Sequence, residues 1–425
     1  MSAQLNRRRV LVMIDQAISS LSNVVVTVFV ARSLPAESFG AFGLAIVAFM
    51  LVQGTSRALV GETLLSRYSS ADADVRGRLV PDMLGAAVTI AGMGAVVVTI
   101  AGLATGGEAG RALVALAIVL PLTIVQDTWR YVFIIDRPAG AVAVDVVWLV
   151  AVCTVLSTAP GGAGAAWFVI AWGVGGGIGA IAGGLLGRRD LAVPQPLRWL
   201  RANRDMGVRF FGEFVTGQAV GQVVLAGVGA IAGLSVIGAV RAAQVFYGPL
   251  NTVHQGIYLA LVPEGARSAG IAHLRRLMVR ATVVLAGIAA VWMWFGLLLA
   301  DSWGATLFGA TWAEAGDLML PMGLAMIAGS AATGGFAGVR ALGDAHESLR
   351  ARLRTAGPQL VFPLVGAAIG AGQGYAFGFG LGHAASAVVW WAAFGSAIAS
   401  SRSATCQGGA DTGADRLTAE STTNV

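Results

Sequence analysis

The sequence predicts an all-α polytopic membrane protein with twelve transmembrane helices in two six-helix lobes. Three observations predict this fold class: the composition, the spacing of long apolar runs, and the placement of the arginines. Of the 425 residues, 56% are hydrophobic, 12% are charged and 59 are glycine, and the mean hydropathy is +0.75. Soluble globular chains carry about 25% charged residues. The composition therefore excludes an ordinary soluble enzyme and a disordered chain.

Twelve apolar runs are long enough to cross a membrane. Crossing a hydrocarbon core about 30 Å thick takes about 20 residues at a helical rise of about 1.5 Å per residue. A helix satisfies its backbone hydrogen bonds within one segment, as lipid requires, so each run predicts a helix. Turn-forming joints such as Ala159-Pro160-Gly161-Gly162 separate the runs. The runs cover residues 10–31, 39–61, 81–103, 112–134, 141–159, 165–187, 208–231, 237–262, 278–300, 317–339, 357–374 and 376–399.

The arginines predict the orientation of the chain. All 28 basic residues are arginine, and 24 of them lie in the N-terminus, the C-terminal tail, or the loops and adjoining run ends on one side of the twelve runs. The opposite loops hold only Arg32 and Arg111, and the other two, Arg57 and Arg241, fall inside runs and away from the loops. Cytoplasmic loops are enriched in Lys and Arg. We therefore expect a multi-pass protein of the cell membrane with both termini in the cytoplasm.

The longest polar link lies between the sixth and seventh runs and divides the chain into two sets of six. The two sets match at offsets of 198 or 200 residues in three pairs: Asp15 with Glu213, Gly40 with Gly238, and Pro121 with Pro321. Because six is even, both sets enter the membrane in the same orientation, as in a parallel repeat with a substrate site between its halves. The predicted parts are an N-terminal lobe (1–187), a cytoplasmic linker (188–207), a C-terminal lobe (208–400) and a disordered cytoplasmic tail (401–425).

Two carboxylates occupy matching places, Asp15 near the start of the first run and Glu213 near the start of the seventh. Ionisable groups inside a membrane cost about 2.5–3.5 kcal/mol on insertion scales and are functional candidates for that reason. We interpret the two acids as candidate ion-coupling residues for a proton or a sodium ion. The alternative is that each acid pairs with a nearby arginine, Arg9 or Arg209, or caps a neighbouring helix.

Four further polar residues inside runs are candidates for substrate binding: Arg57, Arg241, Gln244 and His254. The planar guanidinium group of arginine suits the oxygens of phosphate and pyrophosphate. His254 lies in a polar strip of the eighth run that can line a cavity. The alternatives are snorkelling of the arginines to a membrane interface or structural pairs with nearby carboxylates, and for His254 a hydrogen-bonded place in the core.

The other intramembrane features favour structural roles. Asp127 lies three residues before Arg130, a spacing that predicts an ion pair within one helix. Asp145 lies near the start of a run, where an acid suits a helix N-terminus. Glycines around Gly173–Gly179 favour close helix packing. Several tryptophans near run ends are typical of interfacial anchors, namely Trp148, Trp167, Trp303 and Trp312.

Motifs of soluble catalysis are missing from the sequence. It contains no P-loop, so we expect no ATP hydrolysis by this chain and no enzyme. Cys153 and Cys406 form no disulfide framework, and no His, Cys and Asp residues have metal-ligand spacing. We therefore expect no metal and no cofactor. The basic loops are expected to face anionic membrane lipids and not nucleic acid.

Two stretches carry a family resemblance. Ile14-Asp15-Gln16 followed by residues 31–40, and residues 237–250 followed by Leu261-Val262-Pro263-Glu264, resemble the polysaccharide flippases. These are exporters of lipid-linked oligosaccharides in the MATE-like (MOP) superfamily. The resemblance implies a V-shaped pair of lobes, alternating access and a cationic central cavity for an undecaprenyl-pyrophosphate oligosaccharide. It also implies that Arg57 and Arg241 are candidates for holding the headgroup.

The resulting hypothesis is a flippase that moves a lipid-linked saccharide from the cytoplasmic to the outer leaflet for cell-surface polysaccharide synthesis. An ion gradient is one candidate driving force, and a glycan polymerase or glycosyltransferases are candidate partners. Two alternatives stay open: a MATE-like drug or cation antiporter, and a non-transporting scaffold of a glycan-assembly complex. A cavity filled with side chains would favour the scaffold.

Overall fold

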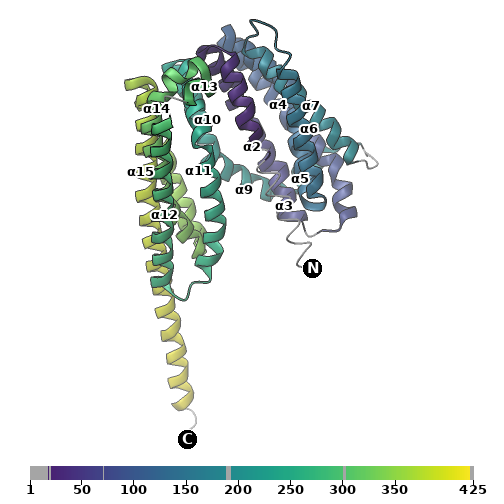
Figure 1. Ribbon diagram of the computed structural model, residues 1–425. Helices are drawn as coiled ribbons and strands as arrows, with labels where there is room; N and C mark the ends of the chain where they lie inside the picture. The colour runs from purple at the N-terminus through teal and green to yellow at the C-terminus, as the bar shows by residue number, and fades with distance from the viewer. Residues whose placement is uncertain (1–17, 19–20, 70, 188–192, 300–302, 422–425) are drawn as a thin grey trace. The chain divides into compact units, whose positions relative to one another are not determined.

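The computed structural model describes residue 18 and residues 21–69, 71–187, 193–299 and 303–421, and Figure 1 shows them as long helices joined by short loops. Every regular element in this part of the chain is helical. Nine of these helices are long and apolar enough to cross a membrane, and a shorter apolar helix spans Leu21–Ser33. The predicted all-α polytopic fold class is confirmed, and the count of twelve helices stays a prediction.

The helices follow the predicted apolar runs closely. The first half of the chain contains the helix over Leu21–Ser33, then α2 (Ala36–Ser56), the π-helical segment η1 (Arg57–Gly61), α3 (Glu62–Tyr68), α4 (Ala73–Thr105), α5 (Gly107–Asp136), α6 (Pro138–Leu156) and α7 (Ala165–Leu186). The rest contains α8 (Pro196–Ala202), α9 (Arg204–Phe214), the π-helical segment η2 (Val215–Ala219), α10 (Val220–Ala232), α11 (Leu234–Ala266), α12 (Ile271–Leu299), α13 (Ala305–Phe308), the 3₁₀ turn η4 (Gly309–Thr311), α14 (Trp312–Ala341) and α15 (Ala345–Ser421).

The long element α15 consists of two antiparallel helices. The backbone leaves helical geometry at Gly370 and Ala371, where Ala371 has a φ of 45°. On either side of this reversal the backbones touch, because a Cβ atom on Gly366 would lie 2.0 Å from the carbonyl oxygen of Gly374. The second helix continues to Ser421, through the region for which the sequence predicts disorder. Extending an existing helix needs no new nucleus, and this stretch contains no proline to end it.

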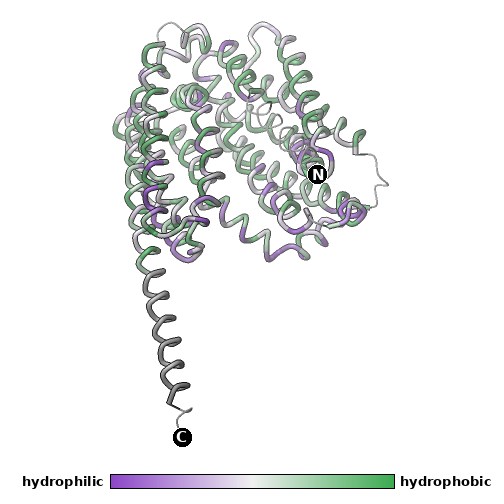
Figure 2. Tube along the Cα trace, turned by 60° about the horizontal axis from the view of Figure 1, so that its bottom comes forward, coloured by the Kyte–Doolittle hydropathy of each residue, from purple (hydrophilic) through white to green (hydrophobic). Residues whose placement is uncertain are grey.

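The described helices form two compact units. The first comprises helices within residues 1–245 and 299–318, and the second comprises helices within residues 246–298 and 319–425. The first unit therefore extends beyond the predicted N-terminal lobe and includes α9, α10 and the start of α11. Hydrophobic residues predominate along the middle of the helices, whereas hydrophilic residues gather toward helix ends (Figure 2).

Small residues bring the helices of the first unit close together. A Cβ atom on Gly173 of α7 would lie 2.2 Å from the side chain of Val119, and one on Gly176 would lie 2.7 Å from Thr123. Both neighbours belong to α5, which lies beside α7 in Figure 1. The predicted packing role of these glycines is confirmed.

The helices α2 and α11 make a reciprocal contact at positions that the repeat matches. A Cβ atom on Gly40 would lie 1.8 Å from the carbonyl oxygen of Leu234, and one on Gly238 would lie 3.1 Å from that of Ala36. At the offset of 198 residues, Gly40 corresponds to Gly238 and Ala36 corresponds to Leu234. Contacts exchanged between corresponding residues are expected of two segments related by a twofold axis.

Part of the predicted linker forms α8, a helix of the first unit that packs against α4. Asp82 of α4 is 2% exposed and accepts hydrogen bonds from the backbone N–H of Gln195 at 2.8 Å and from Nε of Arg198 at 2.7 Å. The indole of Trp199, also 2% exposed, donates to the carbonyl oxygen of Leu59 at 3.2 Å. Sequence reasoning missed this role, although Asp82 is an acid at the start of the apolar run 81–103 and was therefore visible as a polar exception.

Candidate functional site

A cavity of about 560 Å³ lies inside the first unit. Its walls come from the helix over Leu21–Ser33, from α2 with η1 and α3, and from α5, α6 and α7. The lining combines charged groups, carboxamides and aromatic rings, a mixture that suits a binding pocket with a few orienting polar groups. Its charged and amide residues are Asn23, Gln53, Arg57, Gln126, Asp127, Arg130 and Asp145, and its aromatic residues are Phe42, Phe49, Tyr131, Trp148 and Trp172.

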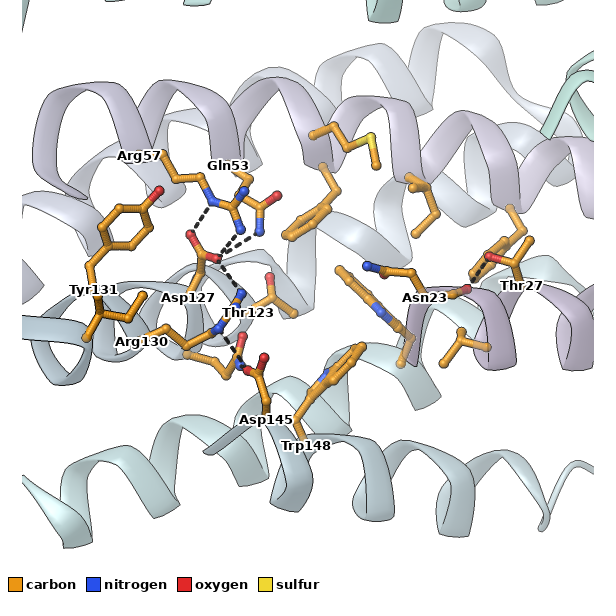
Figure 3. A pocket seen from close by; sticks show the side chains of 18 of the residues that line it. Asn23, Thr27, Gln53, Arg57, Thr123, Asp127, Arg130, Tyr131, Asp145 and Trp148 are labelled. Carbon is orange, nitrogen blue, oxygen red and sulfur yellow. Dashed lines mark hydrogen bonds and ion pairs between the residues drawn. The ribbon is translucent and has the colours of Figure 1, made fainter. Parts of the chain in front are cut away.

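Arg57 and Asp127 form a two-pronged ion pair at one end of this cavity (Figure 3). Nε of Arg57 donates to Oδ2 of Asp127 at 2.9 Å, and Nη2 donates to Oδ1 at 2.6 Å. The amide of Gln53 donates to the same Oδ1 at 3.1 Å. Paired bonds of this kind fix the plane of the guanidinium group and are stronger than neutral hydrogen bonds.

A second ion pair joins Arg130 of α5 to Asp145 of α6. Nε of Arg130 lies 2.9 Å from Oδ1 of Asp145, and Nη1 of Arg130 lies 3.8 Å from Oδ1 of Asp127. The amide of Gln126 donates to Asp145 at 3.1 Å. Two cations and two anions thus alternate as Arg57, Asp127, Arg130 and Asp145, which we call the charge network. Its formal charge is zero, so each buried charge has an opposite neighbour.

Burial distinguishes the members of the charge network. The side chains of Asp127, Arg130 and Asp145 are 5%, 9% and 2% exposed, whereas that of Arg57 is 37% exposed. Nη1 of Arg57 donates no hydrogen bond to any residue in the described part of the chain. Arg57 is therefore the member whose donors are accessible from the cavity.

Local helix geometry explains how these residues meet. Thr123, Asp127 and Arg130 are spaced three or four residues apart on α5 and therefore share one face of that helix. Arg57 begins the π-helical segment η1, which follows α2 directly. Such single-turn π-helical segments occur often at functional sites and shift the direction of the side chains that follow them.

Of the four predicted substrate-binding residues, only Arg57 is among the described residues that line this cavity. Arg241 on α11 lies against α2, with Nη2 3.8 Å from the sulfur of Met50, which lines the cavity. Its Cγ atom would lie 3.5 Å from a Cβ atom on Gly43, so the absence of a side chain there makes room for its stem. Gln244 is half-buried farther along α11.

His254 belongs to the second unit. Its Nε2 atom lies 2.7 Å from Oγ of Ser330 on α14, whose side chain is fully buried. This geometry corresponds to the alternative that the sequence left open, a hydrogen-bonded histidine in the core. His254 is not among the described residues that line the cavity of the first unit.

The structure describes only one of the two candidate ion-coupling residues. Asp15 lies outside the described residues, and Glu213 lies in α9 with an exposed side chain. Among the described residues, no three His, Cys, Asp or Glu side chains are grouped so that they could hold a metal ion.

Sequence reasoning missed most of the cavity wall. The predicted ion pair between Asp127 and Arg130 is present, but Asp127 makes its shorter contacts with Arg57, a partner 70 residues away. Trp148, predicted to be an interfacial anchor, is 8% exposed and lines the cavity. Asp145, expected only at a helix start, pairs with Arg130. The one usable signal was the polar stretch from Gln53 to Arg57, which lies inside an apolar run.

Comparison with known proteins gives a result only at the level of structure. No protein-family model and no curated protein matches this sequence. A solved inward-facing structure of a multidrug resistance MATE family transporter of the MOP superfamily superimposes with a TM-score of 0.62 at 16% identity, covering 91% of this chain and 98% of that one. The lipid II flippase MurJ in an inward closed conformation gives a TM-score of 0.66 at 9% identity, with coverage of 90% and 86%.

A third similar structure is a MOP superfamily transporter from Pyrococcus furiosus, whose binding pocket is described as having reverse polarity. It superimposes with a TM-score of 0.55 at 15% identity, over 92% of this chain and 94% of that one. The likeness extends over nearly the full length of all three proteins. This chain therefore has the fold shared by MATE transporters of the MOP superfamily and the lipid II flippase MurJ, and is a multi-pass membrane protein of that fold.

Proposed function

We propose that the protein is a membrane transporter that flips a lipid-linked, polyprenyl-pyrophosphate oligosaccharide from the cytoplasmic to the outer leaflet by alternating access. The observation that carries the proposal is the cavity of the first unit, with Arg57 at its surface. An arginine whose orientation is fixed by Asp127 and whose Nη1 donors are accessible can bind a phosphate or pyrophosphate oxygen.

The rest of the lining supports a saccharide. The carboxamides of Asn23, Gln53 and Gln126 offer both donors and acceptors to sugar hydroxyls. Trp148 and Trp172 add broad apolar ring faces, on which the C–H faces of a sugar can pack.

The ion pairs favour this substrate over a cationic drug. An antiporter for cationic drugs needs carboxylates that are available to the drug. Here Asp127 is paired with Arg57 and Arg130, and Asp145 is paired with Arg130. A cationic ligand would have to displace an arginine from a buried carboxylate, at considerable cost in free energy.

The volume of the cavity is an argument against a scaffold without transport activity. A scaffold requires no polar space of about 560 Å³ at the level of its membrane helices. Polar groups buried in a membrane protein are expensive and usually mark a substrate or ion pathway.

Transport is tested by reconstituting the protein in liposomes that contain a fluorescent lipid-linked oligosaccharide. We expect the protein to speed the loss of protection from an external quencher relative to empty vesicles. Replacing Arg57 by Ala is expected to lower the flipping rate at least tenfold, since it removes the charged contact to the headgroup. Arg57→Lys should retain part of the rate, because it keeps the charge and loses the planar fork.

A matched control is Arg204→Ala, which removes one exposed arginine from the start of α9 and should leave the rate unchanged. Equal rates for the wild type and Arg57→Ala would remove Arg57 from the mechanism. A wild-type rate equal to that of empty vesicles, together with uptake of a cationic dye, would favour the antiporter.

Ion coupling through Asp15 and Glu213 is a separate proposal that the sequence alone supports. Glu213→Gln is expected to remove any dependence of the flipping rate on an imposed proton or sodium gradient while leaving basal flipping intact. A gradient dependence that persists in this variant would exclude Glu213 from coupling.

A further inference from the structure

A groove of about 910 Å³ lies on the second unit, between α12 and the second helix of α15. Three arginines line it from α12: Arg275, Arg276 and Arg280. Arg276 and Arg280 lie one turn apart on the helix, Arg275 lies directly before Arg276, and all three side chains are exposed. This groove is separate from the cavity of the first unit, and the proposed flipping mechanism does not use it.

The three cations of the groove have no carboxylate partner among the described residues. In the described part of the chain none of them forms an ion pair, and Nε of Arg276 donates to the carbonyl oxygen of Ala272 at 3.3 Å. By contrast, Arg350 and Arg354 lie 3.7 and 3.9 Å from Glu347. No acidic residue is found among the residues that line the groove. The groove therefore presents concentrated positive charge to a ligand.

The opposite wall of the groove is apolar. Trp391, Phe394 and Ile398 follow the spacing of one face of α15. The indole of Trp391 donates to the carbonyl oxygen of Ala331 at 2.8 Å, and its ring meets that of Phe394 edge-on at 5.8 Å. Gly395 leaves the middle of the wall open, since a Cβ atom there would have no neighbour within 4 Å.

We infer that this groove binds one anionic phospholipid of the cytoplasmic leaflet. Its phosphate contacts the arginines of α12, and the part of an acyl chain nearest the headgroup packs against the apolar wall of α15. The arginine distribution predicts that this end of α12 is cytoplasmic, where the leaflet carries anionic headgroups. Basic pockets between transmembrane helices on that side are suited to such headgroups. The apolar wall complements a lipid chain and gives no contact to a free anion.

The test uses the full-length protein in neutral detergent, titrated with phosphatidylglycerol or phosphatidylcholine while bound lipids are counted by native mass spectrometry. We expect one phosphatidylglycerol to bind in preference to phosphatidylcholine. One arginine near an anionic headgroup contributes about fivefold in affinity. The triple variant Arg275→Gln, Arg276→Gln, Arg280→Gln should therefore bind phosphatidylglycerol about a hundredfold more weakly.

Two further variants separate a built site from general electrostatic attraction. Gly395→Phe keeps all charges and fills the groove, and it should lower the affinity at least tenfold. A control, Arg201→Gln, Arg204→Gln, Arg209→Gln, removes the same charge from exposed positions elsewhere and should bind as the wild type does. An excess of inorganic phosphate should not displace the lipid.

The inference is overturned if the two lipids bind equally or if the control triple variant loses as much affinity as the groove variant. Displacement by inorganic phosphate would also overturn it, because it would indicate a simple anion site. A wild-type dimer that Gly395→Phe converts to monomer would show that a second copy of the chain occupies the groove instead.

Discussion

Corresponding helices of the two halves hold different polar groups. In the first half, η1 and α5 contribute Arg57, Asp127 and Arg130 to the charge network. At the offset of 200 residues that matches Pro121 with Pro321, Arg130 corresponds to Ser330 and Asp127 to Ile327. In the second half, Oγ of Ser330 lies 2.7 Å from Nε2 of His254. The same helical positions thus hold buried ion pairs in one half and a contact between a hydroxyl and an imidazole in the other.

The difference shows which features the two halves share and which they do not. The close contact of glycines persists at Gly40 and Gly238, where the helix backbones approach each other. The ion pairs of the charge network are not shared, because a buried ion pair is costly to desolvate and brings no stability that apolar residues could not provide. The charge network is therefore better explained by a task of the first half than by a requirement of the fold.

The largest expected effect comes from breaking the charge network. Asp127→Ala leaves Arg57 and Arg130 without their shared carboxylate, and we expect it to lower the free energy of unfolding by about 3–5 kcal/mol. Equilibrium unfolding in mixed detergent micelles measures this loss. As a control, Asp205→Asn removes the partner of Arg67 at an exposed site and should cost less than about 1 kcal/mol. Similar losses of unfolding free energy in both variants would mean that the charge network contributes no more to stability than an exposed ion pair does.

A smaller effect is expected where the two halves touch. Gly40→Ala places a methyl group against the carbonyl of Leu234 and should cost about 1–3 kcal/mol through overpacking. Gly238→Ala should be nearly neutral, because its closest contacts are 3.0 and 3.1 Å and alanine favours a helix by about 1 kcal/mol. Gly92→Ala, with open space around it, is the control and should not destabilise. A larger loss of stability in Gly238→Ala than in Gly40→Ala would contradict this packing.

The smallest effect is expected in the second half. Ser330→Ala removes the hydrogen bond to His254 and should cost about 0.6 kcal/mol, the average for such bonds between membrane helices. The same unfolding measurement tests it. A loss as large as that of Asp127→Ala would show that the second half depends on polar contacts as strongly as the first, which would remove the contrast between them.

The fold was largely predictable, whereas the site was only partly so. Apolar runs revealed the helices because each span must be apolar over about 20 residues wherever it packs. Arg57 and the polar stretch before it were visible for the same reason, as polar exceptions in such a run. Trp148 and Asp145 were misread, because a position in the sequence does not reveal which neighbour a helix face meets.

The sequence by itself determined the fold class, the approximate bounds of the helices and the short set of charges within them. These follow from the free-energy cost of placing polar groups in lipid, because that cost applies to each span separately. Only the tertiary structure decided that Arg57 pairs with Asp127 and that Arg130 pairs with Asp145, that a cavity lies beside them, and that His254 is elsewhere. Such pairings depend on contacts between helices 15 to 70 residues apart in the chain, for which no local pattern carries a signal.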